Sequence, residues 1–406
     1  MRLERKMRET IADEIADAPV VDWFDQKRML DDPYPDYTRM RELGPVVHVP
    51  AIRRYLLTTH ASVVGAEQKP ESFTAHASRP TMVRALGARP MLRKDDPDHA
   101  AERSAINPTL RPKTVTEVWS PRFRENVEKW LDHLIAIGPE EADLNRDFAA
   151  PVASQNLIDL LGFPEDVRVE DMHRWSTDYI AGIGNVLDDP DIWTRCDASQ
   201  AEANAILDDL LPHLASEPDR SITSHLLQVG LPNEVVRANV HLTISGGLNE
   251  PQHMITNMVW ALATHLEQLD AVRNGEVTWG DAFEETVRYV SPIGMLPRET
   301  TRDLEWHGSR LPAGSDVGLL LASANRDAAV FADPDIYDIR RSSRGHLGFG
   351  NGAHLCAGRW AAKSAIGEVA LPILFERLPG LRIDTRRPTM WNGWVFRGIT
   401  TFPVTW

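Results

Sequence analysis

A long helical pattern interrupted by helix-breaking residues places the strongest constraint on how this chain can fold. Apolar residues recur at helical spacing over 233–267, which predicts a helix of roughly 50 Å at about 1.5 Å per residue. Its centre, residues 246–251, reads Gly-Gly-Leu-Asn-Glu-Pro. Because proline removes a main-chain hydrogen bond and crowds a carbonyl, we expect Pro251 to kink or open the helix and to free the Gly247 carbonyl to hold water.

Length and charge narrow the class of protein. The chain has 406 residues and a formal net charge of -15, which disfavours nucleic acid and anionic membranes as partners. No run approaches the ~18 apolar residues of a membrane span, and the charged N-terminus lacks a signal-peptide core. Two cysteines exclude a disulfide framework. With no repeat or linker, we expect one cytoplasmic domain over residues 1–406.

Helical patterns dominate, so the predicted fold class is mainly α with a minor β portion. Since the first strands lie near residue 50 and the later ones after residue 295, we expect them to pair across the fold. The predicted helices cover 8–18, 34–43, 60–68, 98–109, 114–137, 148–161, 167–187, 197–215, 219–229, 233–267, 280–290 and 358–377. The predicted strands cover 45–49, 53–57, 295–301, 304–306, 316–320, 381–384 and 395–405.

A glycine-rich loop around one cysteine carries the sharpest chemical signal. Cys356 lies just before a predicted helix, where backbone N–H groups and the helix dipole favour a thiolate, the form that binds a soft metal. An isolated cysteine is more often a small buried hydrophobe, and we interpret Cys196 that way. Four glycines surround Cys356 and favour a metal ligand there: Gly348, Gly350, Gly352 and Gly358.

The pattern Phe349-x-x-Gly352-x-x-x-Cys356-x-Gly358 resembles the haem-binding loop of the cytochromes P-450. The resemblance covers the chain from about residue 30 onward. It implies the cytochrome P-450 fold, with haem b between a long distal helix and the helix after the loop. The Cys356 thiolate would be the axial ligand of the iron, and Phe349, Gly350 and Gly358 would lie beside the haem.

Other segments match the same family. Glu285 and Arg288 lie three residues apart on a predicted helix, and in the family such a pair joins a later arginine, here Arg341 with Arg340 as its neighbouring alternative. Haem propionates need cationic or hydrogen-bonding partners. The resemblance assigns that role to four residues: His99, Arg103, Arg298 and His354.

The interrupted helix corresponds to the family's distal helix, whose centre usually reads Ala-Gly-x-Asp/Glu-Thr. Here the acid is Glu250, and Pro251 replaces the threonine with its hydroxyl. We therefore expect proton delivery to rest on Glu250 together with Asn249, backbone groups or water. The alternative is a surface kink with a solvated Glu250.

An amide or similar polar residue followed by Glu-Pro, here Asn249-Glu250-Pro251, resembles a subgroup that demethylates aryl methyl ethers, notably guaiacol O-demethylases, and the C-terminal segment also resembles that subgroup. Phe396 falls where that subgroup places an aromatic against the substrate ring. Ile183 replaces a phenylalanine, and the segment TMVRALGARPM offers no aromatic, so a larger methoxyphenol such as syringol is expected. The predicted pocket consists of Ile183, Leu242, Ser245, Gly246, Ile293, Leu296 and Phe396, mostly apolar as a small aromatic requires.

The implied reaction uses O2 to hydroxylate an O-methyl carbon, and the hemiacetal collapses to formaldehyde and a catechol-type product. Electrons would come from a separate flavin or iron–sulfur reductase, because we find no such segment in this chain. Its docking patch would comprise Arg111, Lys113, Arg359 and Lys363, although a solvated set fits equally well. The alternatives are a P-450 that hydroxylates another small hydrophobic substrate, a peroxide-driven haem peroxygenase, and a non-enzymatic haem-thiolate sensor.

Overall fold

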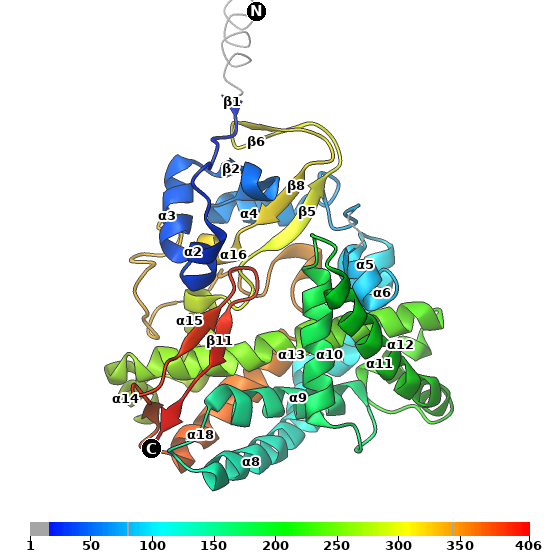
Figure 1. Cartoon of the computed structure of the whole chain (residues 1–406), viewed down its shortest axis with the longest axis vertical. Coiled ribbons are helices and arrows are strands. Elements are labelled where there is room, and N and C mark those ends of the chain that lie inside the picture. Colours follow the sequence, from blue (N-terminus) through cyan, green and yellow to red (C-terminus); the bar gives the residue numbers. More distant parts are fainter. Residues whose placement is uncertain (1–15, 79–80, 343) are drawn as a thin grey trace, which may run out of the picture.

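The computed structural model describes residues 16–78, 81–342 and 344–406, and helices dominate it (Figure 1). The predicted fold class, mainly α with small sheets, is confirmed. In Figure 1 the strands of the main sheet lie in the upper part of the molecule, whereas β11 lies lower, beside α13, where most of the long helices are found. Most of the predicted helix 8–18 lies outside the described residues, and its described end belongs to a short strand, β1 (Ala16–Asp17).

Capping residues set several helix boundaries. The Thr59 side chain accepts a hydrogen bond from the Ser62 N–H at the start of α4, and Gly162 adopts a left-handed conformation after α9. The helices are α2 (Gln26–Asp31), α3 (Tyr34–Leu43), α4 (His60–Glu67), α5 (Thr81–Leu86), α6 (Asp98–Leu110), α7 (Pro112–Thr114), α8 (Ser120–Ile137), α9 (Ala150–Leu161), α10 (Val169–Ile183), α11 (Pro190–Ser216), α12 (Ile222–Gln228), α13 (Asn233–Ala263), α14 (Leu266–Arg273), α15 (Trp279–Val290), α16 (Leu321–Ala324), α17 (Arg359–Ala362) and α18 (Leu371–Arg377).

Shorter helical segments extend three of these helices. The segments that extend them are π-helical: η3 (Val115–Trp119) precedes α8, η4 (Asn145–Ala149) precedes α9, and η6 (Lys363–Ala370) precedes α18. Three separate 3-10 segments are η1 (Pro50–Ile52), η2 (Met91–Arg93) and η5 (Gly352–His354). The segments α17, η6 and α18 follow one another without a gap over 359–377, where the sequence predicts one helix. The sequence analysis did not predict α2, α5, α14 or α16 as separate helices.

The main sheet joins strands that lie far apart in the sequence. Its order is β2-β3-β8-β5-β4, and β3 and β8 run parallel with Tyr55 opposite Val317. This pairing confirms the expectation that early and late strands meet across the fold. The five strands are β2 (Val46–Val49), β3 (Arg54–Leu57), β4 (Phe73–Thr74), β5 (Leu296–Thr300) and β8 (Asp316–Leu319).

Small sheets complete the β portion. The predicted strand 395–405 is divided, because Pro403, which has no N–H to donate, lies between two short strands. An isolated bridge also pairs Ile293 with Phe396. The remaining strands are β6 (Leu304–Trp306), β7 (Ser309–Leu311), β9 (Arg382–Ile383), β10 (Met390–Asn392), β11 (Gly398–Thr401) and β12 (Val404–Thr405); β1 pairs with β7, β6 with β7, β9 with β12, and β10 with β11.

Helix α13 crosses the lower half of the molecule above α8 and α9 (Figure 1). It remains helical through Pro251, so the expectation that proline opens the helix is wrong, whereas the expected kink and the freed Gly247 carbonyl stay predictions. Helices α9, α10 and α15 and strand β11 pack along it, and this packing holds the segment helical despite the lost main-chain bond. The helix also ends at Ala263, earlier than predicted, and α14 begins at Leu266.

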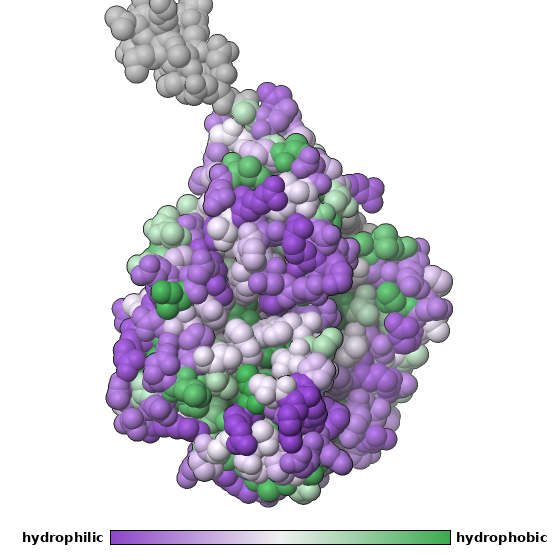
Figure 2. Space-filling model, turned by 60° about the vertical axis from the view of Figure 1, so that its left-hand side comes forward, coloured by the Kyte–Doolittle hydropathy of each residue, from purple (hydrophilic) through white to green (hydrophobic). Residues whose placement is uncertain are grey.

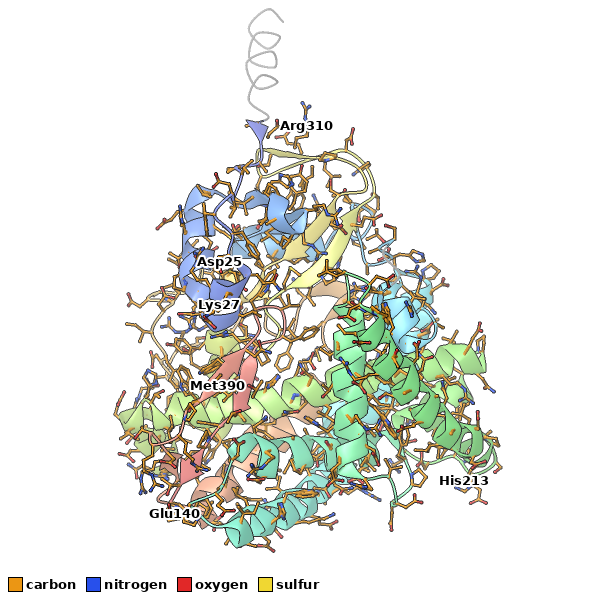
Figure 3. All side chains as sticks on the ribbon, in the orientation of Figure 1. Asp25, Lys27, Glu140, His213, Arg310 and Met390 are labelled. Carbon is orange, nitrogen blue, oxygen red and sulfur yellow. The ribbon has the colours of Figure 1, made fainter. Side chains whose placement is uncertain are left out.

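The surface is mostly hydrophilic. Figure 2 shows hydrophobic residues as separate patches on one face. Side chains fill the interior in Figure 3, whereas the polar residues Glu140, His213 and Arg310 lie at the periphery. Among the helices of the described residues, none combines the length and hydropathy needed to cross a bilayer.

Candidate active site

The loop that precedes Cys356 is fixed by backbone contacts. The Cys356 N–H donates to the Phe349 carbonyl, with a nitrogen–oxygen distance of 2.9 Å. Gly350 and Gly352 have φ values of 70° and 64°, in the left-handed region. A Cβ on Gly352 would lie 2.6 Å from the Glu67 carbonyl oxygen. Glycine is therefore required at this position, both for the backbone angle and for the approach of α4.

The Cys356 thiol faces a cavity, and several groups act on it. Burial is the largest effect and raises the pKa of the thiol, and the Glu250 carboxylate raises it further. The Gly358 N–H and the guanidinium groups of Arg103 and Arg359 lower this pKa. Burial outweighs the stabilisation that we expected from the helix start. A thiolate is therefore expected when a metal cation binds, because a coordinating thiol loses its proton.

The second cysteine has a different setting. Cys196 is fully buried on α11, and its thiol donates to the Ala85 carbonyl at 3.6 Å. Burial raises its pKa to about 12, so it stays protonated at neutral pH. This placement matches the packing role expected for Cys196.

The four residues expected to bind propionates come together at one edge of the cavity. His99 and Arg103 lie one turn apart on α6, Arg298 lies on β5, and His354 lies in the cysteine loop. The His99 and His354 ring centroids are 4.1 Å apart. The Arg103 guanidinium donates to the Leu355 carbonyl at 2.7 Å, which ties α6 to the loop.

Positive charge exceeds negative charge at this edge. Burial lowers the pKa of His354 to about 3, with further lowering by Arg298 and His99. Arg298 is 4% exposed, and within the described part of the chain its guanidinium donates only to the carbonyl of the preceding residue. The acids nearest to Arg298 are Glu67, whose pKa burial raises to about 7, and Asp95, and a third acid, Asp96, lies 3.1 Å from the His99 ring. A ligand with carboxylates would complete this edge.

A cavity of about 1300 Å³ extends from Cys356 to α13. Its walls are mainly apolar, and they include Leu157, Met254, Ile255, Phe283 and Phe349. A thiol on one face, apolar walls and cations at one edge suit a flat apolar macrocycle that bears two carboxylates, and so the residues present fit a haem.

Most of the predicted substrate pocket lies on this cavity. Ser245 is the exception: its hydroxyl donates to the Leu242 carbonyl, and its own carbonyl accepts from Ser176 on α10. Ser245 is 2% exposed and does not line this cavity, so its role in the substrate pocket stays a prediction. Six of the seven predicted residues line the cavity: Ile183, Leu242, Gly246, Ile293, Leu296 and Phe396.

Glu250 and Pro251 line the cavity from the distal side. Burial raises the pKa of Glu250 to about 8, and within the described ranges its Oε2 has no hydrogen-bond partner. The alternative of a solvated Glu250 is therefore wrong. Asn249 does not line the cavity, and its Nδ2 is buried without a partner in the described part of the chain, so its share in proton delivery stays a prediction.

The sequence analysis missed several cavity residues. Thr81 and Met82 on α5, and Met91 and Arg93 beyond it, line the cavity in and beside the segment where no aromatic was found. Burial and the charge of Arg298, Arg54 and Arg89 lower the pKa of Arg93 to about 9. The only sequence signal for Arg93 is its position six residues before His99.

The predicted network behind the site is present. The Glu285 carboxylate accepts from Arg288 at 2.7 Å, and both side chains are fully buried. Arg341 approaches the same carboxylate at 3.5 Å, whereas Arg340 pairs with Glu276 at the surface. Arg341 is therefore the third member, as expected.

Each of the four basic residues of the expected docking patch has a contact within the protein. Lys363 pairs with Glu284 at 2.8 Å, and Lys113 lies 3.9 Å from Glu117. Arg359 lies over the ring of Trp360. Arg111 donates to Thr114. These contacts leave the patch as a proposal.

Comparison with known proteins agrees with this site. The family model described as cytochrome P450 matches residues 281–377, which hold the Glu285 network and the cysteine loop. The biotin biosynthesis cytochrome P450 of Bacillus subtilis is 31% identical over 78% of this chain and 79% of that protein. The vitamin D(3) 25-hydroxylase of Pseudonocardia autotrophica is 32% identical over 92% of this chain and 93% of that protein.

A solved structure shares the fold. A P450 in complex with a hexadec-9Z-enoic acid ligated acyl carrier protein superposes with a TM-score of 0.85 at 26% identity, and the match covers 94% of this chain and 100% of that one. The relatives span nearly the same length, and the matched region carries the thiolate loop. The chain therefore belongs to the cytochrome P450 family of monooxygenases, whose cofactor is a haem-thiolate iron.

Proposed function

We propose that this P450 removes the methyl group from a small aryl methyl ether of the methoxyphenol type, such as syringol. The observation that carries the proposal is the buried Glu250–Pro251 pair, which faces Cys356 across an apolar cavity with Phe396 in its wall. Haem held by Cys356 would supply oxygen activation, and a separate flavin or iron–sulfur reductase would supply electrons.

The apolar wall positions the substrate ring. Phe396 lies opposite Ile293 in an isolated β-bridge, so the strand backbone holds both side chains at the cavity. Leu242 and Gly246 line the same cavity from α13. A methoxyarene would pack its ring against these groups, with its methyl group toward the Cys356 side, and the apolar walls would exclude bulk water.

Glu250 holds the proton that the reaction consumes. Its pKa of about 8 keeps the carboxyl protonated at neutral pH inside the cavity. A group whose pKa lies near the working pH transfers protons most effectively. Pro251 offers no hydroxyl, so among the side chains of this helix turn Glu250 is the one that can deliver a proton to the cavity.

A panel of methoxyarenes tests the proposal. Guaiacol, syringol and their demethoxylated analogues would be titrated into the purified haem protein, and the spin-state shift and the formaldehyde released per reductant consumed would be measured. We expect a high-spin shift and formaldehyde in near-stoichiometric yield with at least one methoxyphenol, and neither with the analogues. Binding without formaldehyde across the panel would refute O-demethylation.

Cavity size favours a second candidate, hydroxylation of another hydrophobic substrate. The cavity, at about 1300 Å³, exceeds the roughly 300–1000 Å³ of most ligand sites, although haem must occupy part of it. Relatives include a methyl-branched lipid omega-hydroxylase of Mycobacterium tuberculosis. Fatty acids added to the same panel distinguish the candidates, because they would give hydroxylated product without formaldehyde.

A third candidate is a peroxide-driven reaction, which the lack of a threonine hydroxyl at position 251 makes worth testing. Since Pro251 stands beside Glu250, the carboxyl can act on added hydrogen peroxide as it would on oxygen. Product formation with peroxide and no reductase would identify a peroxygenase. Turnover in either assay would exclude a purely sensory haem protein.

A further inference from the structure

One arginine in the cavity wall has no acidic partner. Arg93 ends η2 and lines the cavity. Within the described ranges its guanidinium makes one long hydrogen bond, 3.5 Å to the Pro297 carbonyl, and no ion pair. Its pKa of about 9 keeps it charged at neutral pH. A cation that faces an apolar cavity without a counter-charge is costly, so an anion that binds there would be stabilised.

The neighbouring charges do not supply the missing anion. Lys94, the next residue, pairs with the Glu102 carboxylate, and both of these side chains are mostly buried. Burial lowers the pKa of Arg93, and the charges that lower it further are all positive: Arg298, Arg54 and Arg89. Of two adjacent cations, one is therefore neutralised within the protein and the other is left to face the cavity.

The haem carboxylates do not account for Arg93. A haem carries two propionates, and the edge of the cavity already offers one guanidinium for each, from Arg103 and Arg298. His99 and His354 add hydrogen-bonding groups at the same edge. Arg93 is a third guanidinium on the cavity wall, so its charge is left for a second ligand.

The cavity reaches the protein surface near Arg93. Arg54, whose charge acts on Arg93, also lines the cavity. Asp316, an acid in this part of the lining, stands beside Arg54 in the pairing of β8 with β3 and does not act on the pKa of Arg93. An anionic group would be attracted to a mouth with this charge. Three exposed residues also belong to the lining: Gln26, Ala51 and Arg53.

The segment that carries Arg93 is held on both sides. The Met91 N–H donates to the Asn239 side-chain oxygen on α13 at 2.8 Å, and the Asn239 amide donates to Glu102 on α6 at 2.7 Å. Glu102 also pairs with Lys94. Because the residues before and after Arg93 are fixed to α6 and α13, less conformational entropy is lost when its guanidinium binds a ligand.

We propose that Arg93 binds the carboxylate of an acidic substrate whose apolar body extends into the cavity toward Cys356. A guanidinium binds a carboxylate through two parallel hydrogen bonds, so it fixes the orientation of the substrate as well as its position. The substrate class is therefore an apolar molecule with one carboxylate, either a methoxyarene acid or an alkyl acid. This inference goes beyond the proposed function, because it concerns the charge of the substrate and holds for O-demethylation and for hydroxylation alike.

Matched pairs of ligands test the charge requirement. Para-methoxybenzoate would be compared with para-methoxybenzyl alcohol, and dodecanoate with dodecanol, by titration of the purified haem protein and measurement of the spin-state shift. We expect the acid of at least one pair to bind about tenfold more tightly than its alcohol, because hydrogen bonds to a charged group are stronger than neutral ones. Equal affinity, or preference for the alcohol, in both pairs would overturn the proposal.

Variants of Arg93 test the contact itself. We expect Arg93→Gln to raise the Kd of the acid about tenfold and to leave that of the alcohol within about twofold. Arg93→Lys keeps the charge but loses the paired hydrogen bonds, so it should retain part of the preference for the acid. Arg89→Gln is the matched control, because Arg89 acts on Arg93 but does not line the cavity. Equal losses in Arg89→Gln and Arg93→Gln would refute a direct contact.

Haem retention separates a substrate carboxylate from a propionate. The rate at which the protein loses haem to apomyoglobin would be measured for wild type and for two variants. We expect Arg298→Gln to lose haem faster and Arg93→Gln to lose it at the wild-type rate. Faster loss in Arg93→Gln, with acid and alcohol weakened equally, would identify a propionate as the partner of Arg93 and overturn the proposal.

Formaldehyde release keeps this inference apart from the proposed function. If acids bind tightly through Arg93 and no methoxyarene gives formaldehyde, only O-demethylation is refuted. If methoxyphenols give formaldehyde and neither acid is preferred over its alcohol, only the carboxylate site is refuted.

Discussion

The cysteine loop and the centre of α13 face each other across the cavity and are built in opposite ways. In the loop, the N–H of Cys356 reaches the Phe349 carbonyl, and the N–H of Asn351 reaches Glu67 at 3.1 Å. At the centre of α13, Glu250 keeps a polar atom without a protein partner in the described ranges. Glu67 Oε2 also has no partner among the described residues, so the two sides differ in their backbone contacts and in which carboxylate lines the cavity: Glu250 does and Glu67 does not. The loop is therefore held by main-chain hydrogen bonds, whereas the distal acid is open to what binds in the cavity.

Glycines show the same contrast. Gly352 has a left-handed backbone, and a Cβ there would meet the main chain at 2.6 Å. Gly246 is helical, and the nearest atoms to an added Cβ are the Glu250 carboxylate oxygens at 3.7 Å. The first glycine is required by the fold, while the second leaves space beside a reactive group.

Replacing the ligand should give the largest effect. We expect Cys356→Ser to lose the haem-thiolate absorption band of the reduced carbon-monoxide complex, and to lose monooxygenase activity to background, because a hydroxyl is a poor ligand for this iron. The spectrum and formaldehyde release measure both losses. A retained thiolate band would show that Cys356 is not the ligand and would break the contrast between the two sides.

Disturbing the rigid loop should give the next largest effect. Gly352→Ala places a side chain against backbone at a left-handed residue, and we expect about 3 kcal/mol of destabilisation together with reduced haem content. Thermal unfolding and the haem-to-protein absorbance ratio measure these effects. Gly230→Ala is the control, since Gly230 is also left-handed with φ of 71° but no atom lies within 4 Å of an added Cβ. Equal losses of stability and haem content in the two variants would mean that the strain of a left-handed backbone, and not the contact with Glu67, causes the effect.

The cysteine loop could be predicted from the sequence because its residue pattern resembles the haem-binding loop of a known family. Its function depends on residue types at fixed spacing, because Gly352 and Cys356 are set by local backbone geometry. The pairing of early and late strands was also predictable, since the strand patterns lie in two separate parts of the chain. Arg341 was found because it follows a recognisable segment.

Which residues of α13 line the cavity, and whether the helix continues through Pro251, could not be predicted from the sequence, because both depend on helix rotation and on packing. Ser245 and Asn249 stand beside cavity residues in the sequence but do not line the cavity, because neighbouring helical residues differ by about 100°. The continuity of α13 through Pro251 depends on contacts with other helices, which no local propensity reports. Arg93 reaches the cavity from a segment without a distinctive pattern.

Removing the distal acid should affect the rate less than removing the ligand. We expect Glu250→Gln to lower product formation about 10²-fold, since the amide cannot release a proton. The wild-type rate should fall as pH rises above about 8, where the carboxyl ionises, and the variant should lack this decline. A pH series of initial rates and of hydrogen peroxide released measures both. An unchanged profile would remove Glu250 from the reaction.

Stability should reveal the same buried carboxyl. The pKa of Glu250 is raised from 4.5 to about 8 in the folded state, so between these values the unfolded chain binds fewer protons and the free energy of unfolding falls as pH rises. Glu250→Gln removes this loss. We expect the variant to gain stability relative to wild type across that window, by at most a few kcal/mol at about 1.4 kcal/mol per pKa unit, with the full difference above about pH 8. Unfolding temperatures at a series of pH values measure the gain.

The smallest effect is expected at the cavity wall, where apolar contacts act collectively. Phe396→Ala removes one aromatic ring from a lining that includes Ile293 and Leu296, so the substrate keeps most of its contacts. We expect the Kd for a methoxyphenol to rise about tenfold, equivalent to about 1.4 kcal/mol, while the haem-thiolate band stays unchanged. Phe396→Leu keeps an apolar side chain and should recover most of the affinity. Loss of the band in either variant would mean that the distal wall supports the proximal loop, and the two sides could no longer be treated as separate structures.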